Sequence, residues 1–419
     1  MTRIDDAARY RWLVLAVFVL STSINYLDRA TLSALAPVLI GEFHLSNAQY
    51  GLIGSAFSLT YAASAPFAGL LLDRIGLNRA IGFAVGLWSC AGIATGLTSG
   101  LGGLVGCRAV LGAAEAAGIP AAGKAIHQYL RPSERALGNA VNQAGVSLGS
   151  VVAPLLATWI ALRSGWRHAF VVTGVLGLAW IPLWMWVARR VPAAPAPGPH
   201  RVADAAMLRD RRLWVFAAAN ALSMVGYFFW FFWTSKYMVD VYRLSLQQAA
   251  WYVWIPPVFA CCGGFLGGWL SLRLVERGVA APAARFRVCL AAGVVSLATA
   301  ALPWAATPAW ASAGISLSIF AVAAFSVNMY TLPLDVFGAA AAGFAISILV
   351  SSYGAISTVL GPALGAVIDA HGYSPVIVAL AFTPLAACAV LWFTAVVGQA
   401  SACQSERSSD AVRPPRSIP

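Results

Sequence analysis

The chain of 419 residues is 60% hydrophobic and only 10% charged, and its formal net charge is +12. This composition excludes an ordinary soluble domain, because too few polar side chains are present to cover a surface exposed to water. It predicts an all-α membrane protein whose helices are surrounded by the lipid bilayer.

Apolar runs of membrane-spanning length follow one another along almost the whole chain. A helix needs roughly 20 mostly apolar residues to cross the hydrocarbon core, so each run predicts one transmembrane helix. We expect twelve such helices in two bundles of six. The runs cover residues 12–39, 49–72, 79–98, 101–126, 136–162, 169–188, 213–235, 247–273, 286–305, 308–332, 340–368 and 374–398.

Two segments interrupt this pattern and divide the chain. Residues 190–211, RVPAAPAPGPHRVADAAMLRDR, are rich in Pro, Ala and Arg and predict a semi-rigid cytoplasmic linker. Residues 399–419 are polar and predict a disordered cytoplasmic tail. The predicted N-terminal bundle is therefore 1–189 and the C-terminal bundle 212–398.

The basic side chains are unevenly divided between the two sets of loops. The loops on the side opposite the N-terminus keep only Arg163, Arg167, Lys236 and Arg243. The positive-inside rule then places both termini in the cytoplasm of a multi-pass protein of the inner (plasma) membrane. Topology accounts for the basic charge, so nucleic-acid binding is not expected.

The seven cysteines show no metal spacing and are interpreted as small core residues.

The loop after the second run reads GLLLDRIGLNR. It resembles the cytoplasmic loop signature of the major facilitator superfamily, and the resemblance implies that superfamily's fold. Asp73 would receive a helix N-terminus or pair with an arginine across the two halves; the alternative is a solvated turn. The corresponding segment 267–278 has Ser271 or Leu272 in place of the acid. The residues of this candidate gating loop are Gly69, Asp73, Arg74, Gly76 and Arg79.

Glycine-spaced segments lie in the fifth and eleventh runs. They read GVSLGSVVAPL (145–155) and GAISTVLGPALG (354–365). Small residues at this spacing are typical of helices that pack closely, as expected where two halves rock past each other.

Four charged residues fall within the apolar runs: Asp28, Arg29, Arg108 and Glu115. Each would cost roughly 2.5 to 3.5 kcal/mol on a lipid-facing helix centre, so they should face a polar cavity or one another. Arg108 and Glu115 are seven residues apart, nearly on one helical face. We expect Glu115 to be a partner of Arg108 and to release it when protonated. We also expect Arg29 to face the cavity and Asp28 a neighbouring helix. The alternative is a static ion-pair network.

The N-terminal half is similar to the anion:cation symporter family in the segments NYLDR, GLLLDRIG, RAVLGAAEAAGIPAAGKAI, RPSERALGNAV and GVSLGSVVAPL. That family takes up aldonates, hexuronates and related organic anions with protons. The resemblance implies that Arg29 and Arg108 bind substrate, that protonation of Glu115 is linked to substrate, and that Asp28 is a second proton site. Polar substrate or network contacts are implied for Tyr26, Tyr61 and Gln143.

The C-terminal half has no comparable buried charge. Its candidate substrate contacts are Tyr227, Trp230, Asn328 and Ser351, although helix packing explains such residues equally well. The many aromatic residues favour a small or partly apolar anion over a large polyol.

The sequence therefore predicts a proton-coupled symporter that imports a small organic anion by alternating access. A sugar acid such as a hexuronate or an aldonate is the first candidate. The alternatives are another carboxylate (an aromatic acid, a dicarboxylate or a monocarboxylate) or a multidrug or solute exporter. The proton is the only coupling ion or cofactor expected, and we expect no metal and a monomer. No metal cluster or nucleophile with a base is present, so an enzyme is not expected.

Overall fold

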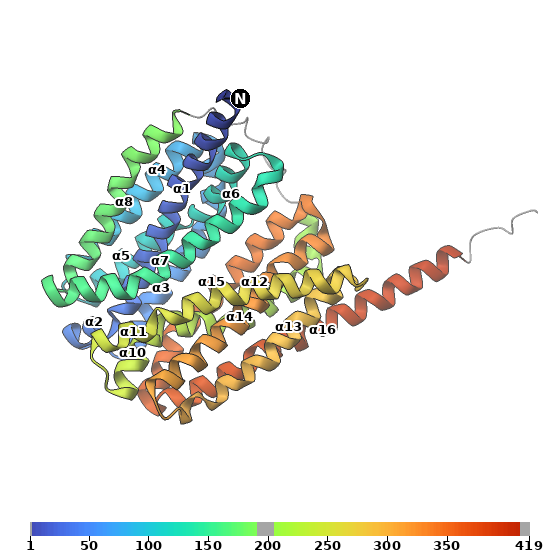
Figure 1. Cartoon of the computed structure of the whole chain (residues 1–419). Helices are drawn as coiled ribbons and strands as arrows, with labels where there is room; N and C mark the ends of the chain where they lie inside the picture. The colour runs from blue at the N-terminus through green and yellow to red at the C-terminus, as the bar shows by residue number, and fades with distance from the viewer. Residues whose placement is uncertain (1, 191–204, 411–419) are drawn as a thin grey trace, which may run out of the picture.

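The computed structural model describes residues 2–190 and 205–410, without the side chains of 2–9, 66, 73, 132, 136, 205–206, 339–342 and 393–410. All regular elements in these ranges are helices (Figure 1). The first half contains α1 (Thr2–Ala34), α2 (Ala36–Phe43), α3 (Asn47–Ile75), α4 (Leu77–Gly96), α5 (Leu101–Glu115), α6 (Gly118–Tyr129), η1 (Pro132–Glu134), α7 (Arg135–Ser164) and α8 (Trp166–Ala188). The second half contains η2 (Ala205–Arg209), α9 (Arg211–Ser223), α10 (Val225–Tyr242), α11 (Leu246–Val253), α12 (Ile255–Glu276), α13 (Ala281–Ser296), η3 (Leu297–Trp304), α14 (Pro308–Phe337), α15 (Ala339–His371) and α16 (Tyr373–Asp410).

Eleven helical stretches of the described chain are long and apolar enough to cross a membrane. The predicted all-α membrane class is confirmed. The remaining predicted run, 49–72, coincides with α3, which has 29 residues but is not one of the eleven. The number of twelve crossings stays a prediction.

Several predicted runs are broken into two helices rather than continuous. The first run breaks at Leu35, and α2 then begins with Pro37 in its first turn. The eighth run breaks at Trp254, and α12 then begins with Pro256 in its first turn. Proline lacks an N–H and is tolerated in the first turn of a helix, so these breaks occur where a new helix can start.

The loops before α3 and α11 share an unusual geometry. His44 and Arg243 both adopt positive φ, 51° and 56°, and end the preceding helices. Two residues later, Ser46 and Ser245 each form a capping box with a glutamine three positions on. The same backbone device at equivalent places indicates that the two halves are structural repeats.

The glycine-spaced segments pack closely, but against different partners. A Cβ on Gly149 of α7 would lie 2.2 Å from the carbonyl oxygen of Ser23 in α1, within the first half. A Cβ on Gly361 of α15 would lie 2.4 Å from the carbonyl oxygen of Gly51 in α3, in the other half. The α15 segment therefore brings the two halves together backbone against backbone.

The two halves meet at one end of the molecule, near α2, α10 and α11, and diverge towards the other end (Figure 1). At the closed end, the Ser235 hydroxyl donates to the carbonyl of Ala34 (2.9 Å), and the Tyr50 hydroxyl donates to the carbonyl of Phe232 (2.9 Å). The carboxylate of Asp369 in α15 accepts hydrogen bonds from the backbone N–H groups of Asn47 and Ala48 at the start of α3, each at 3.1 Å.

The predicted linker and tail are only partly within the described residues. Residues 191–204 and 411–419 lie outside them. Asp210 caps α9, and the hydrogen bond from the Arg212 side chain lowers the pKa of its carboxyl. Helix α16 continues to Asp410, beyond the predicted end of the bundle at 398. Residues 399–410 contain no Gly or Pro and several good helix formers, which explains why the helix does not stop there.

Candidate functional site

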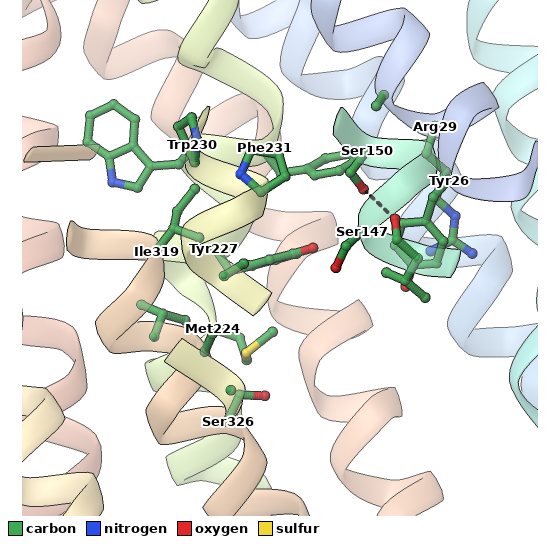
Figure 2. A pocket seen from close by; sticks show the side chains of 18 of the residues that line it. Tyr26, Arg29, Ser147, Ser150, Met224, Tyr227, Trp230, Phe231, Ile319 and Ser326 are labelled. Carbon is green, nitrogen blue, oxygen red and sulfur yellow. Dashed lines mark hydrogen bonds between the residues drawn. The ribbon is translucent and has the colours of Figure 1, made fainter. Parts of the chain in front are cut away.

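A cavity of about 650 Å³ lies between the two halves and is lined by both (Figure 2). From the first half, α1, α3, α5 and α7 supply most of its polar side chains. These are Tyr26, Arg29, Ser33, Ser58, Tyr61, Arg108, Gln143, Ser147 and Ser150. From the second half, mainly aromatic and aliphatic side chains of α10, α11, α12, α14 and α15 face it.

The guanidinium of Arg29 in α1 is held by several side chains of the first half. Its guanidinium carbon lies 5.0, 4.8 and 5.0 Å from the ring centroids of Tyr26, Phe57 and Tyr61. Aromatic faces attract a cation and limit its mobility. The side chain keeps 17% of its surface exposed, and its Nε donates a hydrogen bond to Glu115. Arg29 is therefore both positioned by the protein and accessible to a ligand.

Glu115 is the last residue of α5 and is 1% exposed. Its direct ion pair is with Arg29, and Arg108, the partner expected from sequence, interacts with its charge at longer range. Seven residues along one helix separate two positions by about 10 Å, whereas α1 brings Arg29 alongside the end of α5. The second oxygen, Oε1, has no hydrogen-bond partner among the described residues.

Arg108 of α5 is 3% exposed and also lines the cavity. Its guanidinium carbon lies 5.7 Å from the ring centroid of Phe170, and its Nε has no hydrogen-bond partner within the described part of the chain. The described residues also give it no ion pair. Glu115 and Asp28 interact with its charge only at longer range, and a buried guanidinium without a direct ion pair is suited to a negatively charged ligand.

Asp28 is adjacent to Arg29 but does not line the cavity. It is 2% exposed, and its Oδ1 lies 3.9 Å from the position that a Cβ on Gly92 of α4 would occupy. The hydroxyl of Thr173 in α8 lies beside the carboxyl and also donates to the carbonyl of Phe170 at 3.1 Å. The carboxyl therefore faces the interior of the first half, on the other side of α1 from the cavity.

The remaining predicted contacts divide into two groups. Tyr26, Tyr61, Gln143, Tyr227 and Trp230 line the cavity. Two others, Asn328 and Ser351, are not among its lining residues. The Asn328 amide donates to the carbonyls of Gly267 (3.1 Å) and Ala324 (2.9 Å), so it joins α14 to α12 behind the wall.

Ser147, Ser150, Met224 and Phe231 line the cavity but do not appear among the residues predicted from sequence. The hydroxyl of Ser150 donates to the carbonyl of Val146 (3.0 Å; Figure 2). Ser147 and Ser150 follow Gln143 at helical spacing, so a search for polar residues on one face of this helix would have found them.

The candidate gating loop joins α3 to α4. Gly76 adopts a φ of 81°, which favours glycine, and Arg74 and Arg79 are exposed. The Cβ position of Gly69 meets nothing within 4 Å. The side chain of Asp73 lies outside those that are described.

The equivalent loop of the second half has a different network. Ser271 accepts a hydrogen bond from Arg285, whose Nε donates to Asp335 of α14 at 3.2 Å. Asp335 therefore supplies a carboxylate where the sequence of this loop has none.

Comparison with known proteins is consistent with this architecture. The model of the Major Facilitator Superfamily matches residues 18–354. A hexuronate transporter of Escherichia coli (strain K12) is 30% identical over 404 residues, covering 91% of this chain and 93% of that protein. A galacturonate transporter of Dickeya chrysanthemi is 30% identical over 283 residues, 62% of this chain and 81% of the relative.

The fold is shared with a solved membrane transporter. The crystal structure of a bacterial homolog to the human lysosomal transporter Spinster, inward-facing and occupied, superposes with a TM-score of 0.72 at 22% identity. The similarity covers 92% of this chain and 96% of that one. At this identity the likeness concerns the fold alone.

Proposed function

The chain belongs to the major facilitator superfamily, and we propose that it imports a small organic carboxylate together with protons. It is a multi-pass membrane transporter and not an enzyme, as its named relatives are transporters. The superfamily predicted from the loop motif is thus confirmed, while the substrate and its coupling are our proposal.

The observation that carries the proposal is the presence of two arginines, Arg29 and Arg108, in one cavity between the halves. Guanidinium groups bind carboxylates through paired, charge-assisted hydrogen bonds, and they repel cations. The hydroxyls of Tyr26, Tyr61 and Ser147 on the same side supply further donors and acceptors. The names of the relatives, which transport hexuronate and galacturonate, support a carboxylate substrate.

The ion pair between Arg29 and Glu115 supplies a coupling mechanism. While Glu115 is ionised, it competes with a bound anion for the Arg29 guanidinium. When Glu115 takes up a proton, the pair loses its Coulombic attraction, and Arg29 is free to bind the substrate carboxylate. Proton uptake therefore favours anion binding. Asp28, which is buried within the first half, is a second carboxyl that can hold a proton.

Transport proceeds by alternating access of the central cavity. In our proposal twelve helices cross the membrane with both termini in the cytoplasm, so the closed end with Asp369 faces outward. The backbone contact between Gly51 and Gly361 must separate when the outer side opens. Substrate and proton together permit the return of the loaded carrier.

Uptake by the full chain in proteoliposomes tests this function. We expect an imposed inward proton gradient to accelerate accumulation of carboxylates from a labelled panel that includes hexuronates, aldonates, dicarboxylates and monocarboxylates. Uptake independent of the gradient would contradict proton coupling. Thermal stabilisation only by cationic or neutral compounds would contradict an anion site.

A further inference from the structure

The two sides of the cavity differ sharply in chemistry. Both arginines and the amide of Gln143 belong to the first half. Among the described residues that line the cavity from the second half, none is charged and none carries an amide. A ligand held there has its charged end on one side and the rest of its surface against the other side.

The wall from the second half is mostly apolar, and its polar groups are hydroxyls and the indole of Trp230. Tyr227 and Phe231 stack with ring centroids 6.0 Å apart and an interplanar angle of 19°. Met224 and Ile319 lie beside them in Figure 2 and also line the cavity. The same view shows the hydroxyl end of Tyr227 directed towards the side that holds Ser147. The ring edge is therefore near the polar side, and the ring face belongs to the apolar wall.

The second half places the hydroxyls of Tyr227, Ser326, Tyr330 and Tyr353 at the cavity, but its other polar groups are engaged within the protein. Trp230 lines the cavity, but its indole N–H donates to the Ser318 hydroxyl at 3.2 Å, and Thr234 donates to the carbonyl of Trp230. The buried amide of Asn220 donates to the carbonyl of Leu349 at 2.8 Å, and Asn328 is similarly bonded behind the wall. These donors are engaged within the protein, so the second half offers a ligand several hydroxyls but no free amide.

From this asymmetry we propose that the site selects carboxylates with an apolar ring or chain over polyhydroxylated sugar acids. The inference rests on the proposed function and narrows its substrate class. The carboxylate binds Arg29 and Arg108, and the apolar body packs against Tyr227, Phe231 and Met224. Those hydroxyls of a sugar acid that face the apolar side chains of this wall, away from its few hydroxyls, would lack partners, and an unpaired buried hydroxyl is unfavourable.

A matched pair of ligands tests the inference on the full chain in lipid nanodiscs. Cyclohexanecarboxylate and galacturonate each carry one carboxylate on a six-membered ring, and they differ in their hydroxyls and ring oxygen. We expect cyclohexanecarboxylate to bind at least about tenfold more tightly, since each unmet hydrogen bond weakens binding by about that factor. Equal affinity, or tighter binding of galacturonate, overturns the inference and leaves the proposed anion transport intact.

If neither ligand binds, the inference is also overturned. The rest of the carboxylate panel then decides whether the proposed function fails with it: binding of any other carboxylate retains that function, and binding of none rejects it. The two failures are thus distinguishable.

Substitutions in the wall locate the preference. Met224→Gln keeps the length of the side chain but adds an amide to the apolar surface, and we expect the preference for cyclohexanecarboxylate to fall at least about threefold. Met224→Leu is the apolar control and should keep the ratio. If Met224→Gln does not fold, Val322→Thr on the same wall provides the test. A ratio unchanged by a folded polar variant would show that this wall does not set specificity.

Discussion

The two halves repeat a backbone design but divide the chemistry unequally between them. The positive-φ residue and capping box before α3 recur before α11. In the first half the arginines reach the central cavity. In the second half the ion pairs of Lys236 with Asp240 and of Arg285 with Asp335 lie away from it. The comparison teaches that repeated packing does not require repeated function, because a cavity needs charge on only one wall to orient an anion.

The largest expected effect concerns the buried cations of the two halves. It tests whether anion binding requires a cation at the central cavity or is sensitive to the loss of any buried cation. Arg29→Ala should weaken anion binding about 100-fold, since truncating one member of a buried charge pair costs about 2 to 5 kcal/mol. Lys236→Met is the matched change in the second half, where the cation is 8% exposed and lies 2.5 Å from Asp240. It should lower thermal stability but leave anion affinity within about twofold. Equal losses of affinity in equilibrium binding would break the comparison.

The next prediction separates coupling from binding in the first half. Glu115→Gln removes the titratable competitor of Arg29, so accumulation driven by a proton gradient should be lost while exchange of labelled for unlabelled anion persists. The control is Glu276→Gln, because Glu276 belongs to an exposed pair with Arg273 at 3.4 Å. Gradient-driven uptake in proteoliposomes measures both. Full coupling in Glu115→Gln would exclude Glu115 as the coupling group.

A third prediction concerns the contact that joins the halves. Gly361→Ala places a Cβ 2.2 Å from the Ser55 hydroxyl and 2.4 Å from the Gly51 carbonyl, so α3 and α15 must separate at the closed end. Overpacking of this kind costs about 1 to 3 kcal/mol and should lower Tm and the uptake rate together. Gly268→Ala in α12 meets nothing within 4 Å and should change neither. An unaltered Tm in Gly361→Ala would show that α3 and α15 can separate here without loss of stability.

The smallest effect is expected at the carboxylate that connects α15 to α3. Asp369→Asn keeps one oxygen acceptor but removes the charge at the start of α3, which is worth up to about 1 kcal/mol. Thermal unfolding should show a small decrease in Tm. Asp210→Asn breaks a pair with Arg212 within one half and should have a smaller effect. A larger decrease in Tm for Asp210→Asn than for Asp369→Asn would show that the Asp369 contact adds no special stability to the closed end.

Part of this site was predictable from the sequence. Asp28, Arg29, Arg108 and Glu115 are visible as charges inside apolar runs, and an intramembrane charge needs a cavity or a partner. Their grouping in the first half was also visible. The partner of Glu115 was not, because spacing along one helix reveals only neighbours on that helix.

The second half was harder to interpret, and the reason is physical. Asn328 and Trp230 are polar or amphipathic residues in apolar runs, but their hydrogen bonds depend on which helix packs beside them. The breaks at Leu35 and Trp254 were hidden for a similar reason, since hydropathy does not register a change of helix direction.

The sequence by itself determined the membrane class, the superfamily and the charged residues that need explanation, because these depend on local composition and short motifs. Only the tertiary structure decided that Glu115 pairs with Arg29, that Asp28 faces the interior of the first half, and that the amide of Asn328 turns away from the cavity. Those outcomes depend on the approach of helices that are distant in the chain, and no local pattern records that approach.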